Sequence, residues 1–386
     1  MIYIERFFSS MGFMDLTERH IIMIALALTL MYLGIVKKHE PLLIMPIAVG
    51  MLAANLPMPA ILGLPGFSAY DEGGLFYYIH AGIRSGIFPP LIFLCLGAMT
   101  DFSPLLSSPR SAIIGLGGQL GILVAFFGAT LIGNIIPGFD GFTMQEAAAI
   151  GKIGSSDGPT VIFLAQNLAP DLLPIIAIAG YAYMALVPAI QKPIMRLLTT
   201  DKERVVVMPQ VRVVSKRTKV LFPIITIIAT LLIIPAAGAL VVMLMLGNLI
   251  KESGVADRYV PTLEMHFLNL LTTMIGLAVG AAATAERILN LQAIMIIGLG
   301  LLAFAFGTLG GVLIAKLLNV ITRGKVNPLI GNSALSAMPM AARVSQQMGL
   351  KYNPQNHLLM HAMGPTVAST IISAIAAGIF LALFGA

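Results

Sequence analysis

A short polar interruption at 154–160, inside an otherwise apolar stretch, is the part of this 386-residue sequence best suited to chemistry. It reads Gly-Ser-Ser-Asp-Gly-Pro-Thr, with Asp157 at its centre. Pro159 and the glycines break the helical hydrogen-bond pattern at the point where the Asp157 carboxylate offers oxygen atoms. Because a carboxylate at mid-bilayer costs about 2.5 to 3.5 kcal/mol, we expect an ion site. The alternative is that Asp157 caps a short re-entrant helix.

A second polar interruption spans 327–343 and offers mostly neutral oxygen atoms. Asn327 and Asn332 supply amides, Ser333 and Ser336 supply hydroxyls, and the broken backbone supplies free carbonyls. Carboxylate, amide, hydroxyl and carbonyl oxygens are hard donors that suit Na⁺. Together with Asp157 these residues predict a Na⁺ site. Since a carboxylate also accepts a proton, Na⁺ and H⁺ can occupy such a site in turn.

Two more side chains are candidates for the same chemistry, although their positions leave their roles open. The hydroxyl of Tyr183 could join the oxygen cluster or relay a proton, or Tyr183 could be an interface tyrosine. Arg343 ends the second interruption, where its guanidinium could receive an anionic carboxyl group. The alternative for Arg343 is a cytoplasmic anchor.

The elements that must position these residues are membrane helices, because the chain is 58% hydrophobic and only 10% charged, with a mean hydropathy of +0.93. Two stretches, 146–168 and 327–348, are interrupted by polar residues and predict broken helices or re-entrant hairpins. Cys95 lies in an apolar run, where we expect a small buried hydrophobe. Uninterrupted apolar runs fall near 20–36, 41–56, 88–101, 111–134, 172–190, 220–234, 236–250, 262–280, 291–319 and 356–384.

The two broken stretches resemble each other. A shift of 180 positions aligns Ser156 with Ser336 and Pro159 with Pro339 without a gap. Counting crossings outward from the basic loop gives the two stretches opposite orientations. We therefore expect an all-α polytopic membrane protein with an inverted repeat, whose broken segments meet near the membrane midplane.

One basic loop organises the chain into four parts. Residues 191–219 hold eight cations against two anions, an excess equal to the chain's entire net charge of +6. The positive-inside rule makes this loop cytoplasmic, and it could also dock a soluble partner. Because aromatic residues are not interleaved with the cations, we expect no nucleic-acid partner. The expected parts are 1–87 with N-terminal spans and an outer connection, 88–190 as the first repeat, the loop 191–219, and 220–386 as the second repeat.

Seven motifs spread over nearly the whole chain occur together. With them, the sequence resembles the beta subunits of the biotin-dependent, sodium-pumping decarboxylases, which act on oxaloacetate, methylmalonyl-CoA or glutaconyl-CoA. The motifs are Lys37-Lys-His-Glu-Pro-Leu-Leu, Gly97-Ala-Met-Thr-Asp101-Phe, Asp157-Gly-Pro-Thr160, Tyr183-Met-Ala-Leu-Val-Pro188, Asn327-Pro-Leu-Ile-Gly331, Ser336-Ala-Met-Pro-Met-Ala-Ala-Arg343 and His361-Ala-Met-Gly-Pro365.

The resemblance implies a function and a set of partners. It implies a multi-pass subunit of the bacterial cytoplasmic (inner) membrane that decarboxylates carboxybiotin while exporting Na⁺ and consuming a proton from the outer side. The partners would be a carboxyltransferase subunit, a biotin carrier subunit and a small membrane subunit, with several copies of this chain in the complex. The functional residues that the resemblance implies are Asp157, Tyr183, Asn327, Gly331, Ser336 and Arg343, with Arg343 also contacting the carboxybiotin.

Some features depart from this pattern or compete with it. Lys152 stands five residues before Asp157, where its ammonium could compete with Na⁺ for the carboxylate. Before residue 88 the chain is shorter than the oxaloacetate-specific form of the family that it resembles, which favours an enzyme acting on a CoA ester. His357 and His361 are expected to be buried structural residues rather than a metal pair, and the glycines of 115–121 to serve helix packing.

The main alternative function is a secondary transporter, a sodium-proton exchanger or Na⁺-coupled anion symporter without an enzyme partner.

Overall fold

The structure, a computed structural model, describes residues 3, 7, 11–38, 40–57, 65–337 and 339–385. Over these residues the chain is helical, and none of them forms a strand. Within the described ranges six helices are long and apolar enough to cross a membrane, or up to eight if each of two bent helix pairs counts as one span. The predicted all-α polytopic fold is therefore confirmed.

The elements follow the predicted apolar runs. Those before the basic loop's extended part are η1 (Gly12–Asp15), α2 (Glu18–Ile35), α3 (Pro41–Ala54), α4 (Leu75–Arg84), α5 (Phe88–Met99), α6 (Ser103–Ser107), α7 (Arg110–Gly117), α8 (Gln119–Ile132), α9 (Met144–Gly151), η3 (Lys152–Ser155), α10 (Gly158–Leu168), α11 (Leu173–Leu198) and α12 (Asp201–Arg204). Those after it are α13 (Lys216–Ile233), η4 (Pro235–Ala237), α14 (Gly238–Ser253), η5 (Thr262–Phe267), α15 (Leu268–Ala282), α16 (Ala285–Ile288), α17 (Leu291–Ile321), η6 (Pro328–Ala334), α18 (Met340–Tyr352) and α19 (Leu359–Phe384).

Both interrupted stretches are broken as predicted. The first consists of α9, the short 3₁₀ turn η3 and α10, and Ser156 between them adopts a left-handed conformation with φ of 55°. The second consists of η6, a non-helical link and α18. The broken segments contact α8, α17 and α19, so they lie within the helix bundle. This placement puts irregular backbone inside protein, where it is tolerated in a membrane.

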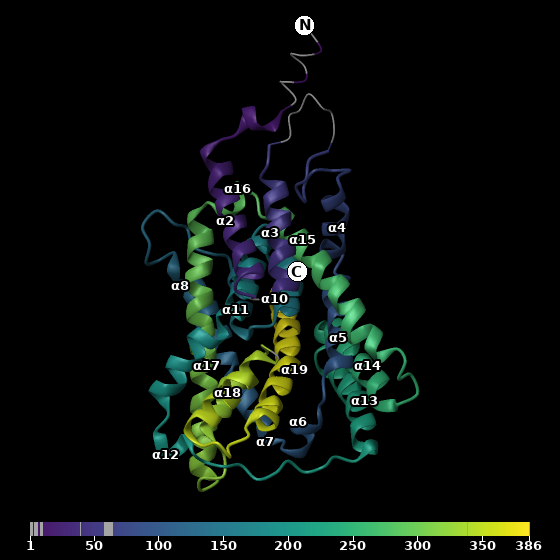
Figure 1. The fold of residues 1–386 in the computed structure, drawn as a ribbon, viewed down its shortest axis with the longest axis vertical. Helices are drawn as coiled ribbons and strands as arrows, with labels where there is room; N and C mark the ends of the chain where they lie inside the picture. The colour runs from purple at the N-terminus through teal and green to yellow at the C-terminus, as the bar shows by residue number, and fades with distance from the viewer. Residues whose placement is uncertain are drawn as a thin grey trace.

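The basic loop lies at one end of the molecule. Figure 1 shows α12 and the segment 205–215 at the lower end, near α6 and α7, whereas α16 and the start of α2 lie at the upper end. The Arg204 guanidinium anchors the loop, since it bonds to Asp201 at 2.6 Å and to the Tyr352 hydroxyl at 3.1 Å. The loop is therefore packed against α18 rather than detached from the bundle.

Glycines let several helices approach closely. A Cβ added at Gly97 in α5 would meet the Leu244 carbonyl of α14, and one added at Gly247 would meet the Leu94 carbonyl. This contact is reciprocal, as expected for two segments related by a two-fold axis. In the glycines of 115–121, a Cβ at Gly117 would lie 2.8 Å from the Gly310 carbonyl oxygen of α17. The prediction of a packing role for those glycines is confirmed.

Cys95 lies in the same α5 contact region. It is fully buried and forms no disulfide, so the prediction of a small buried hydrophobe is also confirmed.

Candidate functional site

Asp157 lies at a break between two helical segments, buried with 4% of its surface exposed. It is the N-cap residue of α10, yet its side chain makes no capping hydrogen bond. Asp157 thus occupies the cap position that the alternative predicted, and a role in binding an ion stays a prediction. The left-handed turn at Ser156 and Pro159 at the start of α10 direct the chain so that the carboxylate stays within the bundle.

The two broken segments meet beside this carboxylate. The Ser336 backbone N–H donates to the Ser155 carbonyl oxygen at 3.1 Å, two residues before Asp157. The Ser336 hydroxyl lies 2.8 Å from the hydroxyl of Thr370 in α19. Asp157 and Ser336, which sequence analysis placed in one site from different stretches, are thus brought together.

Helix α19 contributes a polar stripe that sequence analysis missed. Thr366 donates to the Ser333 carbonyl at 3.0 Å, Thr370 contacts Ser336, and the Ser373 hydroxyl lies 3.1 Å from that of Thr160. The residues Thr366, Ser369, Thr370 and Ser373 recur at intervals of three and four, so they share one helix face. That spacing in an otherwise apolar helix is the signal that could have revealed them.

Three buried oxygen atoms in this region have no hydrogen-bond partner among the described residues. They are Asp157 Oδ2, Ser156 Oγ and Ser369 Oγ. Leaving a buried polar atom unpaired costs about 1 to 3 kcal/mol, so such atoms call for an explanation. A carboxylate and two hydroxyls are the hard oxygen donors that a small cation such as Na⁺ binds.

The hydroxyl of Tyr183 bonds to helix α17 rather than to Asp157. It is buried in α11 and donates to the Ile297 carbonyl of α17. Tyr181, two residues earlier, is the tyrosine beside the site. A Cβ added at Gly158, next to Asp157, would overlap its ring. Helix α11 bends by 62° between its Leu173–Tyr181 and Leu186–Leu198 parts, close to both phenols. Sequence analysis selected Tyr183 and missed Tyr181.

Asn327 and Gly331 shape the second broken segment. The Asn327 amide donates to the carbonyls of Arg204 at 3.0 Å and Val206 at 2.8 Å, and its oxygen accepts from the Leu329 N–H. These bonds tie η6 to the basic loop. A Cβ at Gly331 would meet the Gly311 carbonyl of α17, so Gly331 permits close packing. The contacts of Asn327 and Gly331 do not include Asp157.

A further amide pair fixes η6 to α11. Gln191 Nε2 donates to the Asn332 carbonyl, and Asn332 Nδ2 donates to Gln191 Oε1, both at 2.9 Å. Both residues are fully buried. The pair holds the second broken segment against the helix that carries Tyr181 and Tyr183.

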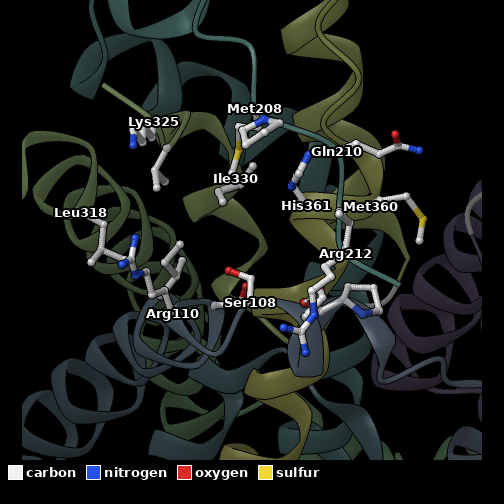
Figure 2. Close-up of a pocket in the computed structure, with 17 residues that line it drawn as sticks. Ser108, Arg110, Met208, Gln210, Arg212, Leu318, Lys325, Ile330, Met360 and His361 are labelled. Carbon is white, nitrogen blue, oxygen red and sulfur yellow. Dashed lines mark hydrogen bonds between the residues drawn. The ribbon is translucent and has the colours of Figure 1, made fainter. Parts of the chain in front are cut away.

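A cationic cavity opens beside the basic loop. It has a volume of about 280 Å³ and lies between α6, α7, the loop segment 208–212, η6 and α19. Figure 2 shows Arg110, Lys325 and His361 arranged around the space, with Arg212 on its rim. The side chains of Arg110, Arg212 and Lys325 are exposed to solvent. No acidic residue lines it among those described, so the cavity suits an anion.

Arg343 lies outside this cavity. It is exposed on α18, and its guanidinium has no hydrogen-bond or ion-pair partner among the residues that the structure describes. His361 is half-buried and lines the cavity, whereas His357 is exposed just before α19, so the prediction of two buried histidines is wrong. In the described ranges His357 and His361 do not belong to any cluster of metal-ligating side chains.

Comparison with known proteins decides what kind of subunit this is. A family model described as the Na⁺-transporting oxaloacetate decarboxylase beta subunit matches residues 19–384. The chain belongs to this family of decarboxylase beta subunits. The resemblance found in the sequence is thereby confirmed, and the site described above is that of a beta-subunit family member.

Three relatives span the family. The methylmalonyl-CoA decarboxylase subunit beta of Propionigenium modestum is 49% identical over 98% of both chains. The glutaconyl-CoA decarboxylase subunit beta of Acidaminococcus fermentans is 48% identical over 97% of this chain and 96% of its own. The oxaloacetate decarboxylase beta chain 2 of Salmonella typhi is 43% identical over 96% of both chains. This beta subunit is therefore similar over its whole length to members named for different acyl substrates.

Proposed function

We propose that this beta subunit decarboxylates carboxybiotin carried by a partner subunit and couples the reaction to Na⁺ export, consuming one proton from the outer side. The observation that carries the proposal is the unpartnered, buried Oδ2 of Asp157 at the point where the two broken segments meet. A buried carboxylate oxygen that accepts no hydrogen bond is available as a ligand for a small cation. Family membership supports Na⁺ as that cation.

In this proposal Na⁺ binds Asp157 Oδ2 together with the hydroxyls of Ser156 and Ser369 and the turn around Ser336. Asn327 and Gly331, which the sequence suggested as ligands, act by holding η6 in place through the contacts described above. The two halves 88–190 and 220–386 form the inverted repeat. The reciprocal packing of Gly97 and Gly247 supports this arrangement.

The carboxylated ureido ring is proposed to bind at the cytoplasmic end, in the cavity of Arg110, Arg212 and Lys325. Cations without acidic neighbours attract a carboxylate and favour its approach. Arg343 is exposed on α18 and serves as a further contact for the incoming carboxyl group. Loss of CO₂ breaks the N–C bond and leaves the electron pair on the ureido nitrogen, which takes up one proton.

Proton delivery is proposed to pass through Tyr183 and Asp157. When Asp157 accepts a proton, its charge is neutralised and its hold on Na⁺ weakens, which favours release to the outer side. Moving one charge against 100 mV costs about 2.3 kcal/mol, so release must be tied to the chemical step. The bend of α11 beside both tyrosines is the element proposed to respond.

The complex is proposed to contain a carboxyltransferase subunit, a biotin carrier subunit, a small membrane subunit and several copies of this chain in a bacterial inner membrane. A CoA ester is the proposed acyl substrate. Purification from membranes distinguishes this complex from the secondary-transporter alternative. A biotinylated carrier and a carboxyltransferase should co-purify with the chain, and their absence would favour the transporter.

Replacing Asp157 with Asn tests the proposal directly. In proteoliposomes holding the purified complex, Asp157→Asn should lower Na⁺-dependent decarboxylation and ²²Na⁺ uptake together by at least about 100-fold, because the amide loses the charge that binds the cation. Asp171→Asn is the matched control, since Asp171 is exposed and pairs with Arg287. Coupled transport that survives in Asp157→Asn would refute the assignment.

A further inference from the structure

Lys152 is a buried cation that the proposed mechanism does not use. Its side chain is fully buried in η3, five residues before Asp157. The ammonium donates to two oxygens of one residue in α19, the Ser373 carbonyl at 2.7 Å and the Ser373 hydroxyl at 2.6 Å. The lysine does not reach towards water, as a lysine near the end of a span does. It is held inside the bundle instead.

The ammonium belongs to the same oxygen cluster as Asp157. The Ser373 hydroxyl that it contacts lies 3.1 Å from the Thr160 hydroxyl, and Thr160 donates to the Asp157 carbonyl at 2.9 Å. Asp157 and a basic side chain are therefore linked within the protein before any ion arrives, through the hydroxyls of Ser373 and Thr160.

The oxygens that hold the ammonium are of the kind that holds a small metal cation. A backbone carbonyl and a hydroxyl beside a carboxylate are hard donors, and an ammonium and Na⁺ carry the same charge. These oxygens, on Ser373, differ from the unpartnered ones on Ser156, Asp157 and Ser369. The cluster thus contains one filled cation position and one set of free ligands.

We propose that the Lys152 ammonium is a built-in cation that occupies one cation position beside Asp157, so that the chain binds one Na⁺ fewer than the same cluster without the lysine. This inference rests on the proposed function only for the identity of the ion as Na⁺. A positive charge on Lys152, in a site of low dielectric, also lowers the affinity of the remaining position for Na⁺. Lys152 is thereby a residue that sets the number of ions moved in each turnover.

Three substitutions separate this role from simple packing. Lys152→Met removes the charge and the hydrogen bonds, Lys152→Gln removes the charge but keeps donors for Ser373, and Lys152→Arg keeps the charge. Lys316→Met is a matched control, because Lys316 also bonds to a backbone carbonyl, that of Leu198 at 3.0 Å, but lies at the basic loop and pairs with Glu203.

The decisive measurement is equilibrium binding of ²²Na⁺ to the purified complex, with the number of ions counted for each beta chain. Lys152→Met and Lys152→Gln should each bind about one more ion than the unaltered chain, with a dissociation constant lowered at least about tenfold. Lys152→Arg and Lys316→Met should bind as the unaltered chain does. Ion uptake for each CO₂ released should rise in step.

Equal ion counts and affinities in Lys152→Gln and the unaltered chain would overturn the inference, as would a gain that also appears in Lys316→Met. Lys152→Gln keeps the test valid if Lys152→Met fails to fold. Binding is measured without turnover, so it judges Lys152 even if the complex does not decarboxylate carboxybiotin. That second failure would reject the proposed function alone.

Discussion

The proposed chemistry of this beta subunit depends on single oxygen atoms and on whether each has a hydrogen-bond partner. The Ser336 hydroxyl has one, Thr370, whereas Asp157 Oδ2 has none among the described residues. A bonded hydroxyl fixes the turn that faces Asp157, and a free carboxylate oxygen is available to an ion. Ser336 thus fixes the shape of the turn, and Asp157 offers the free oxygen atom.

Removing the Ser336 hydroxyl should loosen this turn without removing the carboxylate. Ser336→Ala should raise the Na⁺ concentration for half-maximal decarboxylation by about tenfold, the equivalent of one lost hydrogen bond of about 1.4 kcal/mol. Thr226→Ala is the control, because Thr226 bonds only to Phe222 within its own helix. An unchanged Na⁺ dependence in Ser336→Ala would show that the hydroxyl does not position the site.

At this scale the sequence predicted Asp157 and Ser336 but not their neighbours in α19. Serine and threonine in an apolar helix commonly bond back to their own helix carbonyls, so their presence alone does not indicate a site. Thr370 does this too, at 3.1 Å to Thr366, while also contacting Ser336. Only the tertiary contact distinguishes the two roles, and that contact requires the fold.

At the scale of elements, the broken segments are held by backbone contacts that leave no room for side chains. A Cβ at Gly311 of α17 would meet the Gly331 carbonyl oxygen and the Ala334 side chain of η6. A Cβ at Gly298 of the same helix meets nothing within 4 Å. Alanine substitutions at Gly311 and Gly298 can therefore be compared to separate the effect of packing from that of helix propensity.

Gly311→Ala should destabilise the folded chain by about 1 to 3 kcal/mol, because η6 must move away from α17. Gly298→Ala should be neutral or stabilise by up to about 1 kcal/mol, since alanine favours a helix over glycine. Thermal unfolding in detergent measures both. Equal melting temperatures for the two variants would contradict the close packing of η6 on α17.

Apolar runs and polar interruptions predicted the long helices and both breaks, but the predicted outer connection contains a helix. In α4, Phe76, His80 and Ile83 are buried at intervals of four and three, a helical pattern within a run too short to indicate a span. It meets α5 at an angle of 70°. The angle depends on tertiary packing, so sequence periodicity did not reveal it.

At the scale of the whole molecule, the two ends differ in charge. The end with α12 carries the basic loop and the cationic cavity (Figures 1 and 2). The opposite end carries pairs such as Asp171 with Arg287, in which charges of both signs are matched. An unmatched cationic end gives an anionic partner a preferred direction of approach.

Reversing one charge at the cavity should slow this approach. Arg212→Glu should raise the KM for the carboxylated carrier about tenfold at low salt, and the difference should shrink as ionic strength increases. Arg258→Glu is the control, since Arg258 is exposed on the loop after α14 and does not line the cavity. Equal KM values for the two variants would place docking elsewhere.

The bond from Lys152 to Ser373 has a consequence for synthesis, since it joins residues separated by 221 positions. At about 5 to 20 residues per second, a ribosome needs roughly 10 to 45 s to make the intervening chain. During that interval η3 has been made and α19 has not. Lys152 therefore lacks its Ser373 partner until α19 has been made, and we expect the cluster around Asp157 to be assembled late in synthesis.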